Sequence, residues 1–236
     1  MKPLNKAGFT IIEIMLFLGV SGLLIMGLMM GIGTSINVQR YKDSVKSLQS
    51  FLQQQFSDVN NVTNENEKIN NKCGNDPTAF NRGQSNCVIL GKFIKPNDSG
   101  QTLEIRTVTA VDRVVTSADD MTALHGYTLY IPSISSYDYD IEWGSSIVKT
   151  SPGGQAKFAI LMLRSPISGV TRTFINNSSS DVTPGELLDD TESLKRQVEL
   201  CVNSNGLFTG NTMSVLVKPN ATNSSSIKVL GDDNGC

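Results

Sequence analysis

The sequence predicts an α+β protein in which one long N-terminal helix packs on an antiparallel β-sheet in the head. Three observations predict this fold class. Apolar residues fill positions 9–36, apolar residues then recur every three or four positions from Tyr41 to Val59, and short β-branched runs follow in the rest of the 236 residues. Helix and strand patterns that occupy separate parts of a chain are typical of α+β domains.

Residues 9–36 form a predicted transmembrane helix. Glu13 is the one charged residue between Phe9 and Ile36, and about 20 helical residues are enough to cross the hydrocarbon core of a bilayer. A secretory signal would be shorter and would end in a small-residue cleavage site, which does not occur before the sequence turns polar at Asn37. The segment is therefore expected to remain attached as an anchor.

Residues 37–60 are predicted to continue the same helix outside the membrane, to about Val59. Polar residues separate the members of one apolar stripe, as expected when a single helix face is buried. The stripe consists of Tyr41, Val45, Leu48, Leu52, Phe56 and Val59. We expect this stripe to pack against the head. The Asn-rich stretch 60–75 that follows favours a loop.

Residues 61–236 are predicted to form a β-rich globular head. Short β-branched runs are bounded by Gly, Pro, Asn or Ser, which is typical of strands joined by turns. The expected strands are Cys87–Ile94, Leu103–Val115, Tyr127–Ile131, Lys157–Leu163, Thr171–Ile175, Val198–Val202, Met213–Val217 and Ile227–Leu230. Pro184 suits the first turn of a short helix that runs to about Lys195. The Ser/Asn-rich stretches 176–183 and 219–226 are expected to be exposed loops.

The N-terminus carries a recognisable processing motif. A short basic leader, residues 1–8, ends in Gly8 and is followed by Phe9-Thr-Ile-Ile-Glu13. This sequence closely resembles the type IV prepilin signal. In that family a membrane-embedded aspartic peptidase cuts after the glycine, and the new terminal residue is commonly N-methylated. The resemblance implies cleavage between Gly8 and Phe9, a type IV pilin-like fold and an extracytoplasmic head.

Glu13 is predicted to act in assembly. A carboxylate in a lipid-facing segment is costly unless it finds a partner. The resemblance implies that Glu13 pairs with the free α-amine of Phe9 on a neighbouring subunit, so that the charge is neutralised when subunits stack in register. The alternative is a glutamate placed near the helix start by chance and stabilised by the helix dipole.

The composition of the apolar helix bears on the kind of subunit. Its glycines, Gly19, Gly22, Gly27, Gly31 and Gly33, favour either close helix packing or local loosening of the helix. Many major pilins carry a helix-breaking proline eight residues after the position of Gly22, where this chain has Met30. This departure, and a head larger than a minimal major subunit, favour a minor pilin.

The four cysteines are predicted to form disulfides. Cys73, Cys87, Cys201 and Cys236 include no C-x-x-C pair of the kind used by metal or redox sites. Three pairings are possible, and the local one joins Cys73 to Cys87 and Cys201 to Cys236. Pilins often carry a disulfide in the C-terminal region, which the second pair would supply. The alternative is four free thiols in a reducing compartment.

The sequence offers little for catalysis, and we expect neither enzyme activity nor a cofactor. The lone His125 has no neighbouring cysteine or acidic motif and is expected to lie in a loop. No phosphate-binding G-x-x-x-x-G-K-[ST] loop occurs, so another protein must power assembly. The acidic residues Asp138, Asp140, Asp232 and Asp233, with Asn234, lack the spacing of an EF-hand, and no metal site is assigned to them. A net charge of −2 without a basic run gives no indication of nucleic-acid binding.

The expected function is that of a structural subunit, a minor pilin, in a type IV pilus-like surface filament. The implied partners are a prepilin peptidase, other pilin subunits, an inner-membrane assembly platform and the lipid membrane. The chain is expected to be a single-pass membrane precursor that later enters a cell-surface filament. Two alternatives remain open: a pseudopilin of a type II secretion or DNA-uptake system, and a membrane-tethered adhesin that does not polymerise.

Overall fold

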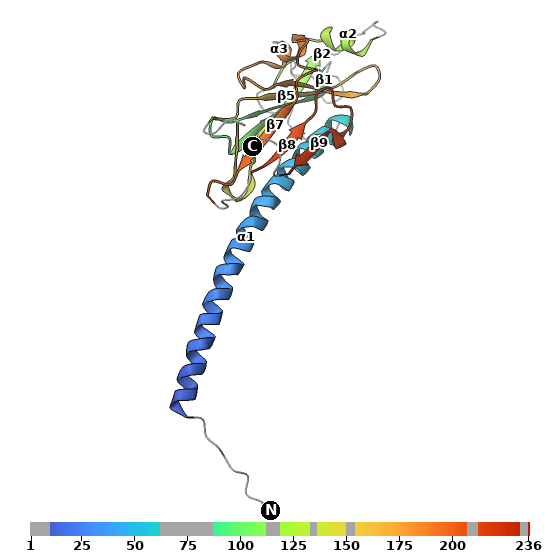
Figure 1. Ribbon diagram of the computed structural model, residues 1–236. Coiled ribbons are helices and arrows are strands. Elements are labelled where there is room, and N and C mark those ends of the chain that lie inside the picture. Colours follow the sequence, from blue (N-terminus) through green and yellow to red (C-terminus); the bar gives the residue numbers. More distant parts are fainter. Residues whose placement is uncertain are drawn as a thin grey trace, which may run out of the picture. The chain divides into compact units, whose positions relative to one another are not determined.

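One long helix, α1, spans Ile11–Asn61 and precedes all the strands (Figure 1). The computed structural model describes residues 10–61, 87–111, 119–132, 136–149, 154–206, 212–231 and 236. The chain divides into two compact units, Met1–Arg40 and Tyr41–Cys236, so that α1 contributes to both. The predicted continuous helix to about Val59 is confirmed, with an end two residues later.

The strands of the second unit form two antiparallel sheets. The first is ordered β3-β2-β1-β5-β6, with β1 Cys87–Pro96, β2 Thr102–Val111, β3 Ser136–Asp140, β5 Ala159–Arg164 and β6 Thr171–Asn176. The second is ordered β4-β7-β8-β9, with β4 Ser146–Val148, β7 Val198–Asn203, β8 Met213–Val217 and β9 Ile227–Leu230. The predicted α+β class, with one long helix packed on antiparallel β-structure, is therefore confirmed, but the strands form two sheets instead of the one sheet expected.

Short helices cover the first sheet on the face away from α1. Helix α2, Asp120–His125, is capped by Asp119, whose side chain accepts a hydrogen bond from the backbone of Thr122. Helix α3, Pro184–Asp189, begins with a capping box between Thr183 and Glu186. Two 3₁₀ turns lie at Glu142–Gly144 and Ser224–Ser226. Leu124 of α2 and Leu187 and Leu188 of α3 pack on one cluster with side chains of β1, β2, β5 and β6.

The other face of the first sheet and the second sheet share a core with α1. All six residues of the predicted stripe are buried, at 5% exposure or less. They belong to one cluster with residues from both sheets, among them Ile105 of β2, Ile160 of β5 and Val215 of β8. The Tyr41 hydroxyl joins the second sheet, since it donates to the Val202 carbonyl at 2.9 Å and accepts from the Met213 amide at 2.5 Å. This part of α1 is therefore a core element of the head.

Two glycines permit close backbone approaches. A Cβ at Gly91 would lie 1.8 Å from the Met162 carbonyl oxygen, where β1 passes β5 just after a register shift between Ile89 and Gly91. Gly100 has φ of +69°, and a Cβ there would lie 2.3 Å from the Ile147 carbonyl oxygen. The β1–β2 turn can therefore pack directly against β4.

A buried polar cluster links α1 to the first sheet. Lys92 of β1 is 6% exposed, and its ammonium group donates to Gln55 Oε1 at 2.7 Å and to Asp58 Oδ2 at 2.9 Å. The Tyr137 hydroxyl of β3 also donates to Gln55 Oε1. A buried cation is tolerated only when it is paired and hydrogen-bonded, so these contacts fix α1 against β1 and β3.

Several sequence expectations for the head need correction. The strand expected at Tyr127–Ile131 is replaced by a single bridge between Tyr130 and Thr109, and His125 ends α2 instead of lying in a loop. The helix from Pro184 ends at Asp189, and a turn covers 191–195. Strands β3 and β4 were not expected. The remaining expected strands appear with ends shifted by a few residues, except that 112–115 and most of the Asn-rich stretch 60–75 lie outside the described residues.

We predict that Lys92→Met lowers the free energy of unfolding by about 3 kcal/mol, because it leaves the Asp58 carboxylate poorly solvated and without its cation. Urea unfolding of the full chain in detergent, followed by circular dichroism, measures this change. Lys95→Met is the matched control on the same strand, since Lys95 makes a more exposed pair with Glu104 and should cost less than about 1 kcal/mol. Equal losses for the two variants would show that the buried pair has no special role.

Candidate functional site

Glu13 lies in the first turn of α1, where it forms a capping box with Thr10. The Thr10 amide and hydroxyl each donate to Glu13 Oε2 at 2.9 Å, and the Glu13 amide donates to Thr10 Oγ1 at 3.3 Å. Such a box satisfies amide groups that a helix start otherwise leaves without partners. The T-x-x-E spacing is a known signal for this arrangement, but only an assembly role and a helix-dipole effect were predicted for Glu13. The carboxylate therefore has local partners before any subunit contact forms.

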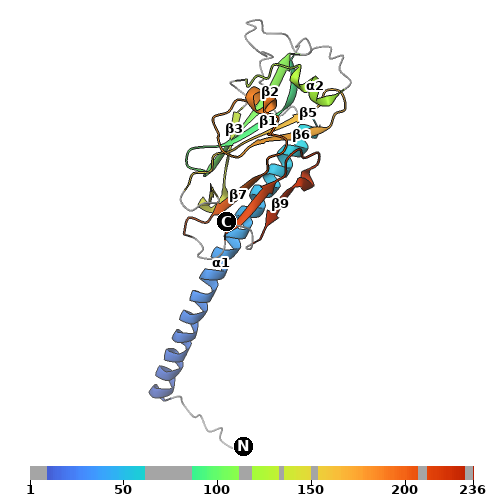
Figure 2. The ribbon, with the colours of Figure 1, turned by 45° about the horizontal axis from the view of Figure 1, so that its top comes forward.

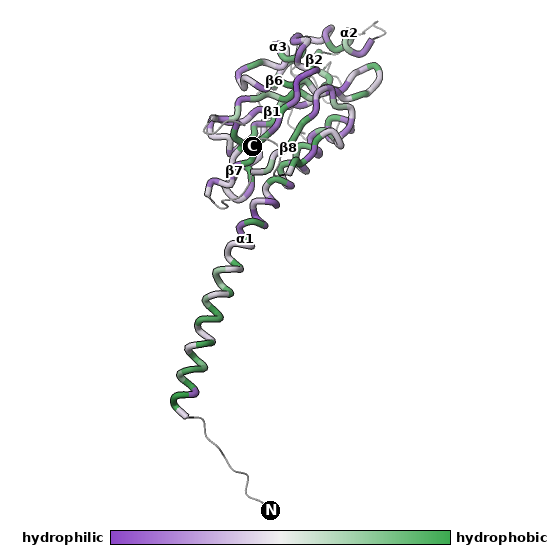
Figure 3. Tube along the Cα trace, in the orientation of Figure 1, coloured by the Kyte–Doolittle hydropathy of each residue, from purple (hydrophilic) through white to green (hydrophobic). Residues whose placement is uncertain are grey.

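The part of α1 that follows Glu13 is apolar on all sides. The large hydrophobic side chains from Ile11 to Ile36 are exposed in the first unit, and the green of hydrophobic residues, broken by paler segments, predominates along this stretch (Figure 3). By length and composition α1 could cross a membrane. A helix that is apolar all round needs an apolar environment on every side, which lipid or a bundle of similar helices would provide.

The glycines of this stretch have no packing role within one copy of the chain. A Cβ at Gly19, Gly22, Gly27, Gly31 or Gly33 would meet nothing within 4 Å. Because each glycine costs about 1 kcal/mol of helix propensity against alanine, any benefit must come from contacts with other molecules or from helix loosening.

Other predicted site residues are placed as follows. Gly8, Phe9 and Cys73 lie outside the described residues, and so does the cleavage site predicted between Gly8 and Phe9. Cys201 of β7 forms a disulfide with Cys236, with their Cα atoms 5.7 Å apart, as in the local one of the three possible pairings. Cys87 is also disulfide-bonded. Asp232, Asp233 and Asn234 lie outside the described residues, whereas Asp138 and Asp140 lie on β3.

One group of potential metal ligands occurs in the described residues, formed by Glu199, Cys201 and Cys236. Both sulfurs are joined in the disulfide, so neither is a thiolate, the form that binds metals. The Glu199 carboxylate accepts a hydrogen bond from Ser214 Oγ at 2.6 Å. The disulfide and the pairing of β7 with β8 therefore explain why these three side chains lie close together.

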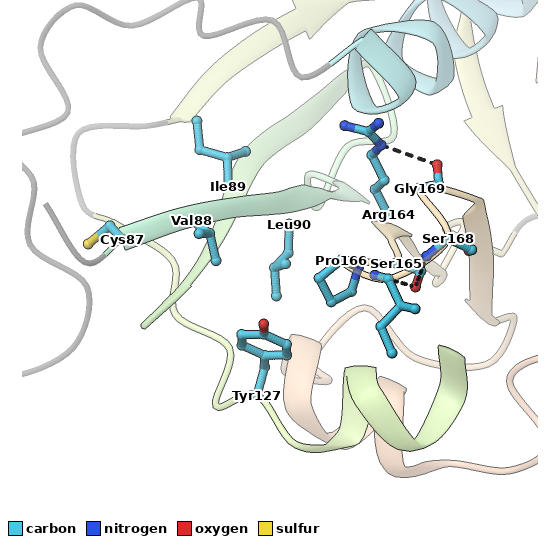
Figure 4. Close-up of a pocket in the computed structure, with 11 residues that line it drawn as sticks. Cys87, Val88, Ile89, Leu90, Tyr127, Arg164, Ser165, Pro166, Ser168 and Gly169 are labelled. Carbon is cyan, nitrogen blue, oxygen red and sulfur yellow. Dashed lines mark hydrogen bonds between the residues drawn. The ribbon is translucent and has the colours of Figure 1, made fainter. Parts of the chain in front are cut away.

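A pocket of about 580 Å³ lies between the start of β1 and the β5–β6 turn (Figure 4). Leu90 and Tyr127 point into it, from β1 and from the segment after α2. Ser165 and Ser168 of the turn donate to the two Asp120 oxygens at 2.5 and 2.8 Å, and these hydrogen bonds lower the pKa of the Asp120 carboxyl. Arg164 Nε donates to the Gly169 carbonyl at 3.1 Å. These polar contacts hold the β5–β6 turn in place.

His125 does not take part in an acid-base arrangement among the described residues. Its Nδ1 lies 2.7 Å from the Met121 carbonyl oxygen, one turn earlier in α2. The hydrogen bond places a donor on Nδ1 and closes the helix end. The side chain of His125 therefore has a structural role at the end of α2.

Comparison of the chain with protein-family models, with curated protein sequences and with solved structures found no match. Functional inference therefore rests on the residues and geometry described above.

We predict that replacing Cys201 and Cys236 together by alanine lowers the free energy of unfolding by about 4 kcal/mol. The bond closes a loop with a sequence separation of 35, and the chain-entropy model gives this magnitude for such a loop. Urea unfolding of the full chain without reductant measures it and leaves the Cys87 bond intact. A loss below about 1 kcal/mol would mean that the chain end is held by other contacts.

Proposed function

We propose that this chain is a non-catalytic structural subunit of a type IV pilus-like surface filament, with its N-terminal helix as anchor and assembly element. The observation that carries the proposal is the combination found on α1. A capped carboxylate, Glu13, opens a helix that is otherwise apolar on all sides for more than twenty residues, and the same helix ends as a core element of a β-rich head.

The leader motif supports the proposed processing route. The Gly8-Phe9 step precedes the apolar helix, so a cut there by a prepilin peptidase would remove the basic leader and keep the anchor. The new α-amine on Phe9 would lie four residues before Glu13. In a stack of such helices, the amine of one copy and the Glu13 carboxylate of another would neutralise each other in an apolar environment, where unpaired charges are strongly disfavoured.

The same features support the proposed partners and location. The exposed apolar stretch would be surrounded by membrane lipid before assembly and by the helices of other pilin subunits afterwards. A prepilin peptidase on the cytoplasmic side and an inner-membrane assembly platform would act on the chain between these two stages. The absence of the helix-breaking proline at Met30 favours a minor subunit. A pseudopilin would use the same chemistry in a different machine, whereas a tethered adhesin would not need Glu13.

The test compares wild type, Glu13→Gln and Thr10→Ala in cells that assemble the filament. We expect all three mature chains to begin at position 9, because neither substitution touches the Gly8-Phe9 step. Glutamine can still serve in a capping box but cannot neutralise an amine, so Glu13→Gln should be cut normally and be missing from sheared surface filaments. Thr10→Ala loses the cap and keeps the charge, and should still be incorporated.

The readouts are the mass and N-terminal sequence of the chain from membranes and from the sheared fraction. An uncut N-terminus found only in membranes would contradict the filament function and favour a tethered adhesin. Normal incorporation of Glu13→Gln would contradict the assembly role of the charge, and would leave helix capping as the function of this residue.

A further inference from the structure

Within the second unit, strands β3 and β9 contact opposite sides of α1. On the β3 side, the Ser47 hydroxyl lies 3.0 Å from the Tyr139 hydroxyl, and Phe51 stacks on the Tyr139 ring at 3.8 Å. On the β9 side, the Nε2 atoms of Gln49 and Gln53 both donate to the Ile227 carbonyl, at 3.2 and 3.0 Å. At about 100° per residue these two sets of helix positions lie about 180° apart around α1. Figure 2 shows β9 alongside the C-terminal part of α1.

The β3 side carries a group of carboxylates, which we call the acidic flank: Asp138, Asp140 and Glu142. All three side chains are exposed, because Tyr137 and Tyr139 alternate with the aspartates and turn toward α1. Asp140 accepts from Thr102 Oγ1, and Glu142 accepts from Ser47 Oγ, both at 2.8 Å. None of the three forms an ion pair within the described residues.

The β9 side carries a group of lysines, which we call the basic flank: Lys42, Lys46, Lys218 and Lys228. Lys42 and Lys46 precede Gln49 and Gln53 by seven residues each, which is close to two helix turns and places them on the same side of α1. Lys228 is on β9, and the Lys218 amide pairs with Ser226 just before that strand. All four are exposed, and none has an ion-pair partner among the described residues.

The two flanks are complementary to each other but cannot meet within one copy, because α1 and the core separate them. Strands β3 and β9 are also outer strands of the two sheets. Strands β3 and β9, beside which the flanks lie, contact α1 between Ser47 and Gln55. Two copies with parallel helices could therefore bring opposite charges together at the same height.

We propose that the acidic flank of one copy docks on the basic flank of a second copy of this chain. The inference rests on the proposed filament function and adds the surfaces through which neighbouring heads recognise each other. Because the two surfaces differ, the contact is heterologous, and repetition gives a ring or an open helical filament instead of a closed dimer. Lys42 and Lys46 extend the basic flank about 10 Å toward the N-terminus, which allows the neighbour to sit offset along the helix.

Complementary charges of this kind mainly determine which surfaces meet and in which orientation. Exposed charge pairs are individually weak and are screened by salt, so the attraction that holds copies together must come mainly from the apolar helices. The flanks then select one lateral arrangement among those that the helices permit. Reversing the charge of one flank should therefore reduce incorporation into filaments, because it places like charges opposite each other.

The test uses two charge-reversed full-length chains in the assembling cell. The first carries Asp138→Lys with Asp140→Lys, so that both of its flanks are basic. The second carries Lys218→Glu with Lys228→Glu, so that the part of its basic flank beside β9 becomes acidic while Lys42 and Lys46 on α1 stay basic. We expect each chain alone to enter sheared filaments roughly tenfold less than wild type, and the two expressed together to be restored, since the reversed flanks now match.

Matched controls carry the same charge changes elsewhere on the head. Asp181→Lys with Asp189→Lys changes exposed carboxylates around α3, and Lys149→Glu with Lys157→Glu changes exposed lysines near β4 and β5. Both controls should assemble like wild type. Protease resistance of all four chains checks that the heads are folded. If the flank variants assemble like the controls, or if folded flank variants are not restored together, the proposal is wrong.

Cross-linking of isotopically mixed wild-type chains provides a second measurement, independent of yield. A carbodiimide joins a lysine to a carboxylate only when the two are in contact, and mixed labels identify links between copies. We expect links from the basic flank to the acidic flank, and links between copies only at other positions would overturn the proposal. If wild type itself is uncut or absent from filaments, the filament function fails; if wild type assembles and only these results are negative, the flank inference alone fails.

Discussion

Burial of one face of α1 between Tyr41 and Val59 is the constraint on which the rest of the head depends. The first sheet has apolar side chains on both faces, and α2 and α3 cover only one of them. The other face and the second sheet have α1 as their shared partner, at side chains that are 5% exposed or less. A head cut from the chain after α1 would therefore expose a continuous apolar core surface and lose the Lys92 cluster.

The two parts of α1 suit two different environments, because the pattern of apolar residues changes along the helix. Up to Ile36 it is apolar on every side, with the exception of Glu13 and small polar residues, and beyond Tyr41 only one face is apolar. A helix apolar all round suits lipid or a helix bundle, whereas a single apolar stripe suits the surface of a domain core. The change in pattern coincides with the division of the chain at Arg40, so the division follows from the sequence.

The elements with strong local signals could be predicted from the sequence. The apolar run, the Tyr41–Val59 stripe and most β-branched runs give α1 and the expected strands, because burial imposes a period on the residues that are buried. Strand β3 was missed because Ser136-Tyr-Asp-Tyr-Asp140 is polar overall, although its alternation with tyrosine is a strand signal. The separation into two sheets depends on long-range pairings such as Val148 with Cys201, which no local pattern contains. The capping box of Glu13 could have been found from Thr10, whereas the two charged flanks depend on the fold.

Glu13 and the charged flanks would have different roles in subunit recognition, because Glu13 lies in an apolar helix and the flanks are exposed to solvent. A charge pair in an apolar helix bundle is costly when mismatched, so it can enforce the register of helices along their axes. Exposed pairs between heads are weak and screened, so they can bias orientation while still permitting subunits to detach and rearrange. Within the second unit, Tyr41, Gln55 and Asp58 hold α1 to the head. The helix that carries Glu13 therefore also carries the side chains on which the strands beside both flanks pack, so that one element of the chain would take part in both levels of recognition.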